Sequence, residues 1–537
     1  MKKLFLFLFL IASFAGFSQE DAWVYFKDKP NSATYLSSPL TMLTQRALDR
    51  RTNQGIALDN VDVPIYQPYI DQVIASNGIT VKAKSKWLNC VHVRGSQADI
   101  NALKLVSSVL RVDYADRSLN STKRTTAKLK SKLVNKVLET AVNYNYGSSA
   151  NQIQMLNGHL LHQLNYTGNG KIIAVLDAGF PGVNTALPYK RLRDNNQILG
   201  GYDYVNKSAI FYSGSNHGTN VLSSMGGYVD GQLIGTAPDA QYYLFITEDS
   251  ASENPVEESN WVEAAEEADR LGVDIISTSL GYFAYDNPNY SHTYADMIGN
   301  LAFASQGANI AFNKGIIVVA SAGNEGLATE KHIGIPAEAN NVIAVGAVKP
   351  DRTYATFSSI GPSYDLRVKP DVMAQGQTVV LSDPNGNIVT ANGTSFACPI
   401  TAGMVACLWQ AFPSKTNIQI KQLITQSADR FSAPTNQFGY GIPDFNLALS
   451  NGLSVEELLN DELAIYPNPT NDFVSFNLPK NIDTKNIYIY SLTGQKVIEE
   501  NTTTQLPIIS LKTLNSGIYF YKIESNGYLK TGKIIKQ

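Results

Sequence analysis

Short runs of apolar residues recur through the middle of the chain, and most of them show no alternation of polar and apolar positions. Four of these runs are rich in Ile and Val: residues 171–176, 273–277, 316–320 and 341–346. Strands buried on both faces of a parallel sheet have this composition, because helices cover both sides of the sheet. Two of the covering helices are predicted at residues 259–271 and 297–314. The pattern from about residue 142 to 450 therefore predicts an α/β domain with a mostly parallel sheet flanked by helices.

The segment before this domain has a different pattern, in which predicted strands and helices alternate. Strands are predicted at 23–27, 87–93 and 109–113, and helices at 40–57 and 99–108. The first helix carries a basic cluster, Arg46, Arg50 and Arg51. This β-α-β-α-β order predicts a small α+β domain at residues 19–118. Its two interpretations are a folding and inhibitory prosegment and a separate binding module.

The end of the chain predicts only strands. Apolar and tyrosine-rich runs at 487–490, 517–523 and 528–535 are separated by Thr-Gly and Asn-Gly turns. Such spacing is typical of hairpins in a β-sandwich. Residues 462–537 are therefore predicted to form a small, separate all-β sandwich.

Length, charge and cysteines narrow the classes of protein. A chain of 537 residues is too long for one hydrophobic core, in agreement with several domains. The net charge of -3 gives no basis for binding nucleic acid or an anionic membrane surface. Cys90, Cys398 and Cys407 have no metal-binding spacing, and an odd number argues against a disulfide framework in an exported chain. We interpret them as buried small hydrophobic residues.

Export is indicated by the N-terminus. Lys2 and Lys3 precede an apolar run at 4–14, and small residues lead to a cleavage point after Ser18, so residues 1–18 are predicted to be a signal peptide. No later run is long and apolar enough to predict a transmembrane helix. Residues 119–145 are polar, basic and poor in large apolar side chains, which predicts an exposed linker open to proteolysis.

The strongest candidate chemistry lies in residues 392–410, NGTSFACPITAGMVACLWQ. A glycine turn brings Ser395 to the start of an apolar stretch with helical character. Free backbone N–H groups and the positive end of the helix dipole would stabilise an oxyanion there. Pro399 is expected in the first turn, where no intrahelical donor is lost. An ordinary core helix after a glycine turn is the alternative interpretation of this stretch.

Three other residues complete a candidate catalytic set with Ser395. Asp177 ends a predicted buried strand, His217 opens a small-residue helical stretch, and Asn324 follows the strand 316–320. A serine hydroxyl needs an adjacent base, and imidazole has a suitable pKa. A carboxylate orients and stabilises that imidazole, and an asparagine amide donates to an oxyanion. Each residue alone is a weak signal, but their joint placement at strand ends and helix starts is strong.

These motifs resemble the subtilisin-like serine proteases, the subtilases. The chain order Asp, His, Ser is that of the family. The resemblance covers roughly residues 150–448 and implies that Asp177 orients His217, that His217 is the general base, and that Ser395 is the nucleophile. It implies an oxyanion-hole role for Asn324. It also implies two substrate-binding segments. Ser279, Leu280 and Gly281 would be the edge strand that pairs with the substrate backbone, and Ala322 and Gly323 would form a wall of the first specificity pocket.

Some features depart from the family or carry no assignment. Ala178 stands where the family usually has Ser or Thr, which removes a hydroxyl that would support Asp177. Phe396 and Cys398 change the packing after the nucleophile, and Cys398 as an alternative nucleophile is disfavoured. His159 and His162 lie three apart on a predicted helix without a third ligand, so we expect an exposed pair and no metal site. Subtilases often bind structural calcium, but no loop here has a ligand spacing that assigns it.

The flanking segments resemble known companions of the family. Residues 21–115 are similar to the subtilase inhibitory propeptide, and residues 465–537 resemble the type 9 secretion sorting domain of Bacteroidetes. The resemblance implies a secreted or cell-surface endopeptidase, residues 146–450 being catalytic, with protein or peptide substrates and no cofactor for the chemistry. The propeptide would be its intramolecular inhibitor, and the secretion machinery would bind the C-terminal domain. Two alternatives remain, a non-catalytic surface-binding protein on this scaffold and a peptide ligase or transacylase.

Overall fold

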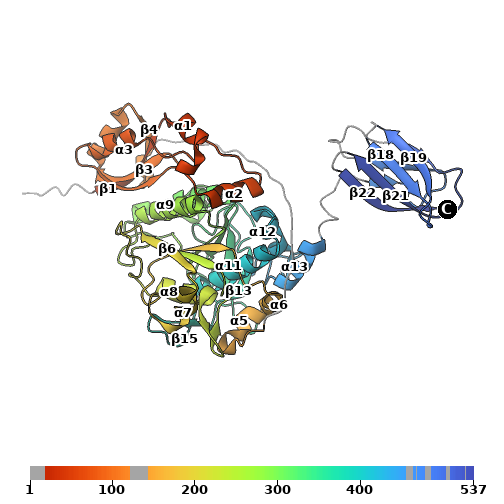
Figure 1. Cartoon of the computed structure of the whole chain (residues 1–537). Helices are drawn as coiled ribbons and strands as arrows, with labels where there is room; N and C mark the ends of the chain where they lie inside the picture. The colour runs from red at the N-terminus through yellow and green to blue at the C-terminus, as the bar shows by residue number, and fades with distance from the viewer. Residues whose placement is uncertain are drawn as a thin grey trace, which may run out of the picture. The chain divides into compact units, whose positions relative to one another are not determined.

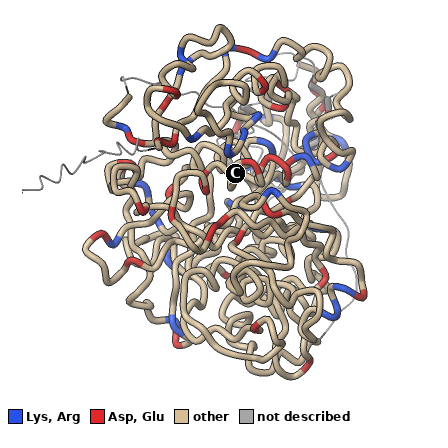
Figure 2. Tube along the Cα trace, turned by 90° about the vertical axis from the view of Figure 1, so that its left-hand side faces the viewer, with Lys and Arg blue, Asp and Glu red and all other residues tan. Residues whose placement is uncertain are grey.

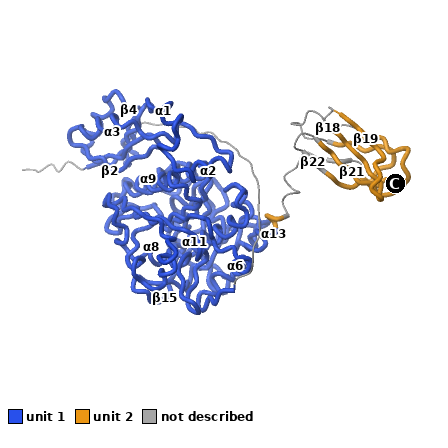
Figure 3. Tube along the Cα trace, in the orientation of Figure 1, with its two compact units in different colours: residues 1–450 blue, residues 451–537 orange. Residues whose placement is uncertain are grey.

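The computed structural model describes residues 19–120, 143–454, 464–466, 468–477, 485–502, 508–525 and 528–537. The predicted signal peptide, and all of the predicted linker except its two ends, lie outside the described residues. The chain divides into two compact units, residues 1–450 and 451–537 (Figure 3). Positive and negative residues are intermixed along the described trace (Figure 2), in agreement with the small net charge.

A seven-stranded sheet forms the centre of the first unit, and all its neighbouring strands are parallel. Its strands, in spatial order, are β13 (Val372–Gln375), β12 (Ile343–Val348), β11 (Ile317–Ser321), β10 (Ile275–Thr278), β5 (Ile172–Asp177), β9 (Gln241–Ile246) and β6 (Ile198–Asp203). Every residue of β5, β10, β11, β12 and β13 is buried. This burial explains the Ile- and Val-rich runs, and the predicted α/β fold with its parallel sheet is confirmed.

Helices cover both faces of this sheet (Figure 1). Alternate residues of β5 divide between two cores, with Ile173 and Val175 facing one and Ile172, Ala174 and Leu176 the other. The first core contains α8 (His217–Gly226) and α11 (Thr394–Ala411), and the second contains α9 (Val256–Leu271) and α10 (Phe303–Asn313). The prediction of a helix from residue 297 is wrong in its start, because a short 3₁₀ turn and irregular chain precede Phe303.

Shorter elements complete this domain around the main layers. They are α5 (Ala150–Gln154), α6 (Gly158–Gln163), α7 (Lys190–Asp194), α12 (Asn417–Gln426), α13 (Phe445–Ser454), β7 (Tyr228–Val229), β8 (Leu233–Ile234), β14 (Val379–Ser382) and β15 (Ile388–Ala391).

The N-terminal domain is a four-stranded antiparallel sheet with helices, in the order β2-β3-β1-β4. Its elements are β1 (Gln19–Phe26), α1 (Ser32–Ser37), α2 (Gln45–Asn53), α3 (Gln67–Ile74), β2 (Thr80–Ser85), β3 (Cys90–Ser96), α4 (Gln97–Ala102) and β4 (Val109–Tyr114). The predicted order was incomplete, because it omitted α1, α3 and β2 and began the second strand three residues early. Residues 86–89 form a turn that links β2 to β3. The α+β class is nevertheless confirmed.

This N-terminal domain packs on α9 and α10 through specific contacts. Trp23 stacks on Phe303 with ring centroids 5.1 Å apart, and its indole N–H donates to Ser259 Oγ at 2.8 Å. The buried carboxylate of Glu266 accepts hydrogen bonds from the Ser85 hydroxyl at 2.6 Å and from the backbone N–H of Trp87 at 2.9 Å. The sheet of this domain therefore covers the second helical layer.

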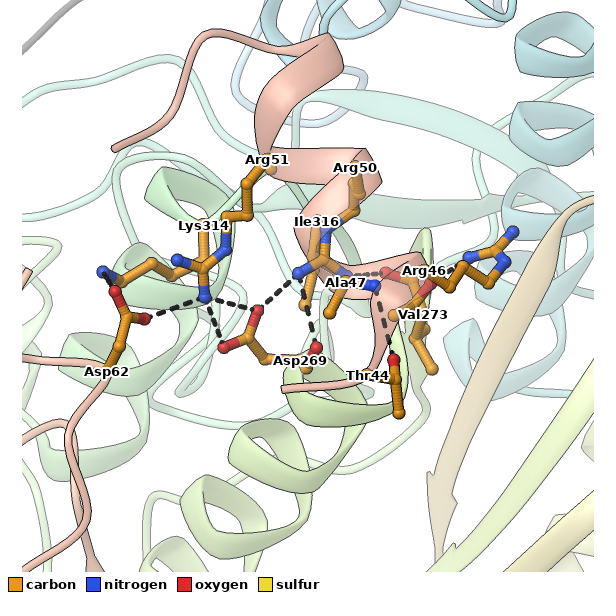
Figure 4. A network of polar contacts seen from close by, with 12 residues as sticks. Thr44, Arg46, Ala47, Arg50, Arg51, Asp62, Asp269, Val273, Lys314 and Ile316 are labelled. Carbon is orange, nitrogen blue, oxygen red and sulfur yellow. Dashed lines mark hydrogen bonds and ion pairs between the residues drawn. The ribbon is translucent and has the colours of Figure 1, made fainter. Parts of the chain in front are cut away.

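Helix α2 adds a buried network of charges to the same interface (Figure 4). Arg51 Nη2 lies 2.7 Å from Asp269 Oδ2 and 2.9 Å from Asp62 Oδ1, and Arg50 pairs with the same Asp269 carboxylate. Lys314 Nζ lies 3.1 Å from Asp62 Oδ2. Asp62 belongs to the N-terminal domain, whereas Asp269 and Lys314 belong to the α/β domain. Each domain therefore contributes both basic and acidic residues to the ion pairs across the interface.

The described residues of the second unit form two small antiparallel sheets. One has the order β16-β17-β20, formed by Ala464–Tyr466, Phe473–Asn477 and Ile508–Ser510, and the other has the order β19-β18-β21-β22, formed by Lys496–Thr502, Lys485–Tyr490, Gly517–Ser525 and Tyr528–Lys536. Phe476 of the first sheet and Ile487 and Ile523 of the second share one core. The predicted all-β sandwich is confirmed.

Candidate functional site

Asp177 and His217 meet at the carboxyl end of the central sheet. Asp177 is the last residue of β5, and His217 is the first residue of α8. The His217 Nδ1 atom lies 2.8 Å from Asp177 Oδ1, and the carboxylate is completely buried. The negative charge of Asp177 raises the pKa of His217 above its ordinary value, against the opposing effect of burial. The imidazole is therefore oriented, and its protonated form is stabilised.

One oxygen of the Asp177 carboxylate lacks support. Oδ1 also accepts the backbone N–H of Ala178 at 2.8 Å, but Oδ2 is buried and has no hydrogen-bond partner within the described ranges. The Ala178 side chain offers no donor at this position.

Ser395 occupies the second position of α11, where the expected helix begins. Its side chain is nearly buried, and its hydroxyl lies 3.4 Å from the backbone oxygen of Ser279. The ring of the following residue, Phe396, has its centroid 5.9 Å from that of His217. Ser395 thus comes to the same end of the sheet as the Asp177–His217 pair.

Pro399 is the sixth residue of α11, so its predicted place in the first turn is wrong. A residue here would normally donate its N–H to the carbonyl four residues earlier, which belongs to Ser395. The Ser279 hydroxyl donates to that carbonyl instead, at 2.7 Å. Sequence reasoning missed this role of Ser279, although a proline four residues after the candidate nucleophile signals a carbonyl in need of another donor.

Asn324 is held beside the start of α11 by Thr394. Its side-chain oxygen accepts the Thr394 N–H at 2.9 Å and lies 3.1 Å from the Thr394 hydroxyl. Because the oxygen is engaged in this way, the amide nitrogen is the end of the side chain that remains as a donor. The backbone N–H of Gly323, whose φ is +105°, donates to the Thr394 hydroxyl oxygen at 3.2 Å.

The predicted substrate-binding residues lie at the same carboxyl edge. Ser279, Leu280 and Gly281 follow β10, and Ala322 and Gly323 follow β11, the neighbouring strand. Gly281 is exposed, whereas Ser279 and Leu280 are largely buried. The segment after Gly281 is anchored by Tyr282, which exchanges backbone hydrogen bonds with Ile335 at 2.9 and 3.3 Å.

The three cysteines and His162 lie inside the protein, whereas His159 is half-buried. All three cysteines are buried and unpaired by disulfides, as predicted. Burial raises the pKa of the Cys398 thiol to about 12, which makes it a poor nucleophile. The expectation of an exposed histidine pair is wrong for His162, which is completely buried between the Tyr146 hydroxyl at 2.8 Å and the Thr236 carbonyl at 2.9 Å. Burial lowers the pKa of His162 to about 4.

Among the described residues, no helix combines the length and the apolar character that crossing a bilayer requires.

Comparison with known proteins agrees with this division of the chain. Residues 21–132 match the peptidase S8 propeptide domain of Bacteroidota, and residues 464–537 match the secretion system C-terminal sorting domain. The protein is therefore exported through type 9 secretion, to the cell surface or beyond it. Both resemblances predicted from the sequence are confirmed.

The chain is similar to proteins of Bacillus subtilis over half of its length or more. Subtilisin NAT of Bacillus subtilis subsp. natto is 29% identical over 293 residues, which are 54% of this chain and 68% of the relative. Serine protease AprX of Bacillus subtilis (strain 168) is 28% identical over 391 residues, which are 67% of this chain and 79% of the relative. A crystal structure of MycP1 with its N-terminal propeptide removed is 22% identical, with a TM-score of 0.44, and the match covers 56% of this chain and 96% of that one.

Residues 168–441, half of the chain, match the subtilase family itself. The parallel sheet flanked by helices and the candidate residues at its carboxyl edge lie within this match. The chain therefore belongs to the subtilase family and is a subtilisin-like serine endopeptidase.

Proposed function

We propose that Asp177, His217 and Ser395 form the catalytic triad of this endopeptidase. The observation that supports it most is the 2.8 Å contact of His217 Nδ1 with a buried Asp177 carboxylate, beside the N-terminal turn of α11 that carries Ser395. With Nδ1 engaged, the other ring nitrogen is the one that accepts the Ser395 proton.

The proposed reaction proceeds through an acyl-enzyme. Ser395 Oγ attacks the scissile carbonyl carbon while its proton passes to His217. The C–N bond then breaks, and His217 returns the proton to the leaving amine. A water molecule, deprotonated by His217, hydrolyses the ester and releases Ser395. All of these groups belong to the protein, so the proposed chemistry requires no cofactor.

Asn324 and the backbone of Ser395 are proposed to stabilise the oxyanion. The Asn324 oxygen is engaged by Thr394, which leaves its amide nitrogen to donate. The N–H of Ser395 lies in the first turn of α11, where it has no intrahelical acceptor and where the helix dipole favours negative charge. Removing one such donor typically lowers the rate ~10²–10³-fold, a range that comes from subtilisin, a member of the same family.

The proposed substrate is an extended protein or peptide segment. Ser279, Leu280 and Gly281 would pair with its backbone as an added strand, a mode that depends little on side-chain identity. Ala322 and Gly323 would form the wall of the pocket for the residue before the scissile bond. We further propose that the N-terminal domain inhibits this site until it is removed, and that the secretion machinery binds residues 464–537.

Labelling with a fluorophosphonate tests the triad directly. We expect a single labelled residue, Ser395, identified by peptide mass spectrometry. The labelling rate should fall as the pH is lowered through the pKa of His217, because protonated imidazole cannot accept the serine proton; Asp177 places this midpoint above the ordinary value of about 6.5. The heat-denatured chain is the control. Labelling of Cys398, or a rate that does not change with pH, would contradict the proposal.

The Ser279 hydroxyl is expected to position the nucleophile. Ser279→Ala leaves the buried Ser395 carbonyl without a donor, which costs about 1–3 kcal/mol, and we expect a roughly tenfold lower kcat with little change in KM. Adding Pro399→Ala restores the backbone N–H and should recover part of the loss. Ser277→Ala, a buried control two residues earlier on β10, should have a smaller effect. Equal losses in the two single variants, with no recovery in the double variant, would refute this role.

A further inference from the structure

The surface of the α/β domain that lies under α2 is built around arginine side chains. Arg46 Nη2 lies 2.7 Å from Asp274 Oδ2. Arg50 and Arg51 share the Asp269 carboxylate, whose two oxygens lie 2.7 and 2.9 Å from Arg51 Nη2 (Figure 4). Two carboxylates of the α/β domain thus bind three arginines of one helix.

The carboxyl end of α9 supplies further acceptors to the same arginines. The last carbonyls of a helix have no partner within it, and the helix dipole makes this end favourable for cations. Just beyond α9, the Gly272 carbonyl accepts a hydrogen bond from Arg46 Nη1 and the Val273 carbonyl accepts one from Arg50 Nη1. A guanidinium group has five N–H donors in one plane and needs several acceptors at once. We call the acceptors on Asp269, Gly272, Val273 and Asp274 the arginine site.

The backbone beside the arginine site is shaped to receive a helix. Gly272 has φ at +82°, and a Cβ there would lie only 2.8 Å from the backbone nitrogen of Ala47. The Thr44 N–H donates to the Arg270 carbonyl at 2.9 Å. The start of α2 therefore rests directly on the end of α9, which a residue larger than glycine at position 272 would prevent.

The α/β domain recognises α2 through polar groups. The buried apolar residues around this helix form a cluster of their own, made of Met42, Leu43, Ala47 and Val63. All four belong to the N-terminal domain, and no described residue of the α/β domain is part of the cluster. The apolar side of α2 is thus satisfied within its own domain. A helix from another protein could present arginines to the arginine site in the same way.

Removal of the N-terminal domain would leave buried carboxylates of α9 without their partners. Among the residues that the structure describes, Arg50 and Arg51 are the only hydrogen-bond and ion-pair partners of the Asp269 side chain. Glu266, three residues earlier, accepts hydrogen bonds from residues 85–87 of the N-terminal domain and, within the described ranges, from no residue of its own domain. The vacated surface therefore complements a basic ligand.

Lys314 limits which basic ligands fit. Its ammonium nitrogen lies 3.1 Å from Asp62 Oδ2 and 3.0 Å from Asp59 Oδ1, both in the N-terminal domain. Because Asp62 also contacts Arg51 at 2.9 Å, charges alternate in sign from Asp269 to Lys314. A ligand with an acidic residue beyond its arginines matches this order, whereas Lys314 repels a purely basic one.

The arginine site lies away from the proposed substrate cleft. Asp274 directly precedes β10, at the amino edge of the sheet, and the substrate-binding residues 279–281 follow the same strand at the carboxyl edge. At about 3.3 Å per residue, the four residues of β10 place roughly 13 Å between the two. A ligand in the arginine site therefore leaves the cleft open.

We propose that, after the N-terminal domain has been removed, the arginine site binds arginine-bearing helical segments of protein substrates. The inference rests on the proposed removal of that domain. The bound segment carries two arginines one helical turn apart, as Arg46 and Arg50 are on α2. It holds the substrate on the enzyme while a separate, extended stretch enters the cleft, which lowers KM without raising kcat.

Fluorescence anisotropy of a labelled peptide with the sequence of residues 40–57 tests this binding. It is titrated with wild-type enzyme that has lost its N-terminal domain, as verified by intact mass, and has been blocked with a fluorophosphonate. We expect saturable binding, and a Kd at least about tenfold higher for the Asp269→Asn enzyme. Glu267→Gln, a partly exposed position on the same helix, is the matched control and should bind as the parent does. Binding should be lost in a peptide with three changes, Arg46→Gln, Arg50→Gln and Arg51→Gln.

Kinetics provide a readout that a general loss of stability would not produce. A fluorogenic substrate joined by a flexible linker to the sequence of residues 40–57 should have a KM at least about fivefold lower than one joined to the arginine-free sequence, with the same kcat. In the Asp269→Asn enzyme, the two substrates should have the same KM.

Failure of the proposed processing and failure of the arginine site give different results. If the wild type keeps its N-terminal domain, the processing proposal is wrong. The titration is then made on the Ser395→Ala chain, cut within residues 119–145 by added trypsin and freed of the domain by gel filtration. In either preparation, three results would overturn the arginine site: no binding by the parent, equal Kd values for Asp269→Asn and Glu267→Gln, or equal binding of the two peptides.

Discussion

Replacing Ser395 by Ala is expected to abolish proteolysis and to leave the N-terminal domain attached. The alanine has no hydroxyl to form the acyl-enzyme, so only non-covalent stabilisation of the transition state remains. In subtilisin, a relative of this chain, loss of the corresponding nucleophile lowers kcat on the order of 10⁶-fold, and we expect a loss of similar size here. Processing within residues 119–145 should stop as well if the enzyme cleaves itself.

The measurement compares the wild-type and Ser395→Ala forms of residues 19–461 by intact mass and casein hydrolysis. The wild type should lose its N-terminal domain and digest casein, while the variant should keep its full mass and stay inactive. Cys398→Ala is the matched control, because this buried thiol lies three residues from Ser395 and its pKa is raised to about 12. It should mature and digest casein.

Two results would contradict this expectation. If the wild type and Ser395→Ala mature alike and neither digests casein, another protease performs the processing and the scaffold has a binding role. If Cys398→Ala is as inactive as Ser395→Ala while folded, the thiol takes part in the chemistry after all. Added amine nucleophiles, analysed by product mass, would separate peptide ligation from hydrolysis.

The central sheet, and the placement of the candidate residues at its edge, were predictable because local sequence determines them. Residues 172–176 are all apolar and all buried in β5, so the sequence alone indicates a strand that is covered on both faces. The residues that end or follow these strands, such as Asp177, then lie at the carboxyl edge by topology alone. The predicted and observed elements agree best for strands that are buried along their whole length.

Long-range contacts could not be predicted in the same way. His162 resembles an exposed residue in sequence, but Tyr146 and Thr236 come from other elements to enclose it. Pro399 was expected in the first turn, and only the Ser279 hydroxyl, 116 positions away from Ser395, explains its tolerance further inside the helix. These contacts depend on how segments that are distant in the sequence pack together. A single sequence does not show that packing.

The basic cluster on α2 is the clearest case, and it leads to the second large prediction. Arg50 and Arg51 were visible in the sequence, whereas their partner Asp269 lies in the other domain (Figure 4). Asp269 is completely buried, which by itself raises its pKa, but the charges of Arg51 and Arg50 lower it below the ordinary value. Its carboxylate is therefore ionised and shared by two guanidinium groups.

Asp269→Asn is expected to weaken the hold of the N-terminal domain on the enzyme severely. It removes the carboxylate charge that pairs with Arg50 and one of the two that pair with Arg51, which also contacts Asp62, and breaking a buried pair in this way costs about 3–5 kcal/mol. This corresponds to an affinity between the two domains that is roughly 10²–10⁴-fold lower. In the active chain, inhibition should end sooner, so the lag before casein hydrolysis should shorten.

Glu267→Gln provides the matched control for this experiment. It lies two residues away on the same helix and forms a partly exposed pair with Arg270, and surface pairs of this kind contribute about 0–1 kcal/mol. Denaturant unfolding of both variants in the Ser395→Ala chain should show a much lower midpoint for Asp269→Asn only. Equal midpoints and equal lags for the two variants would mean that the sheet contacts of Trp23 and Glu266 hold the domain without the arginines. A lower midpoint and a shorter lag in Asp269→Asn alone would instead show that α2 holds the N-terminal domain on the enzyme. Its ion pairs would then have to break before this protease becomes active.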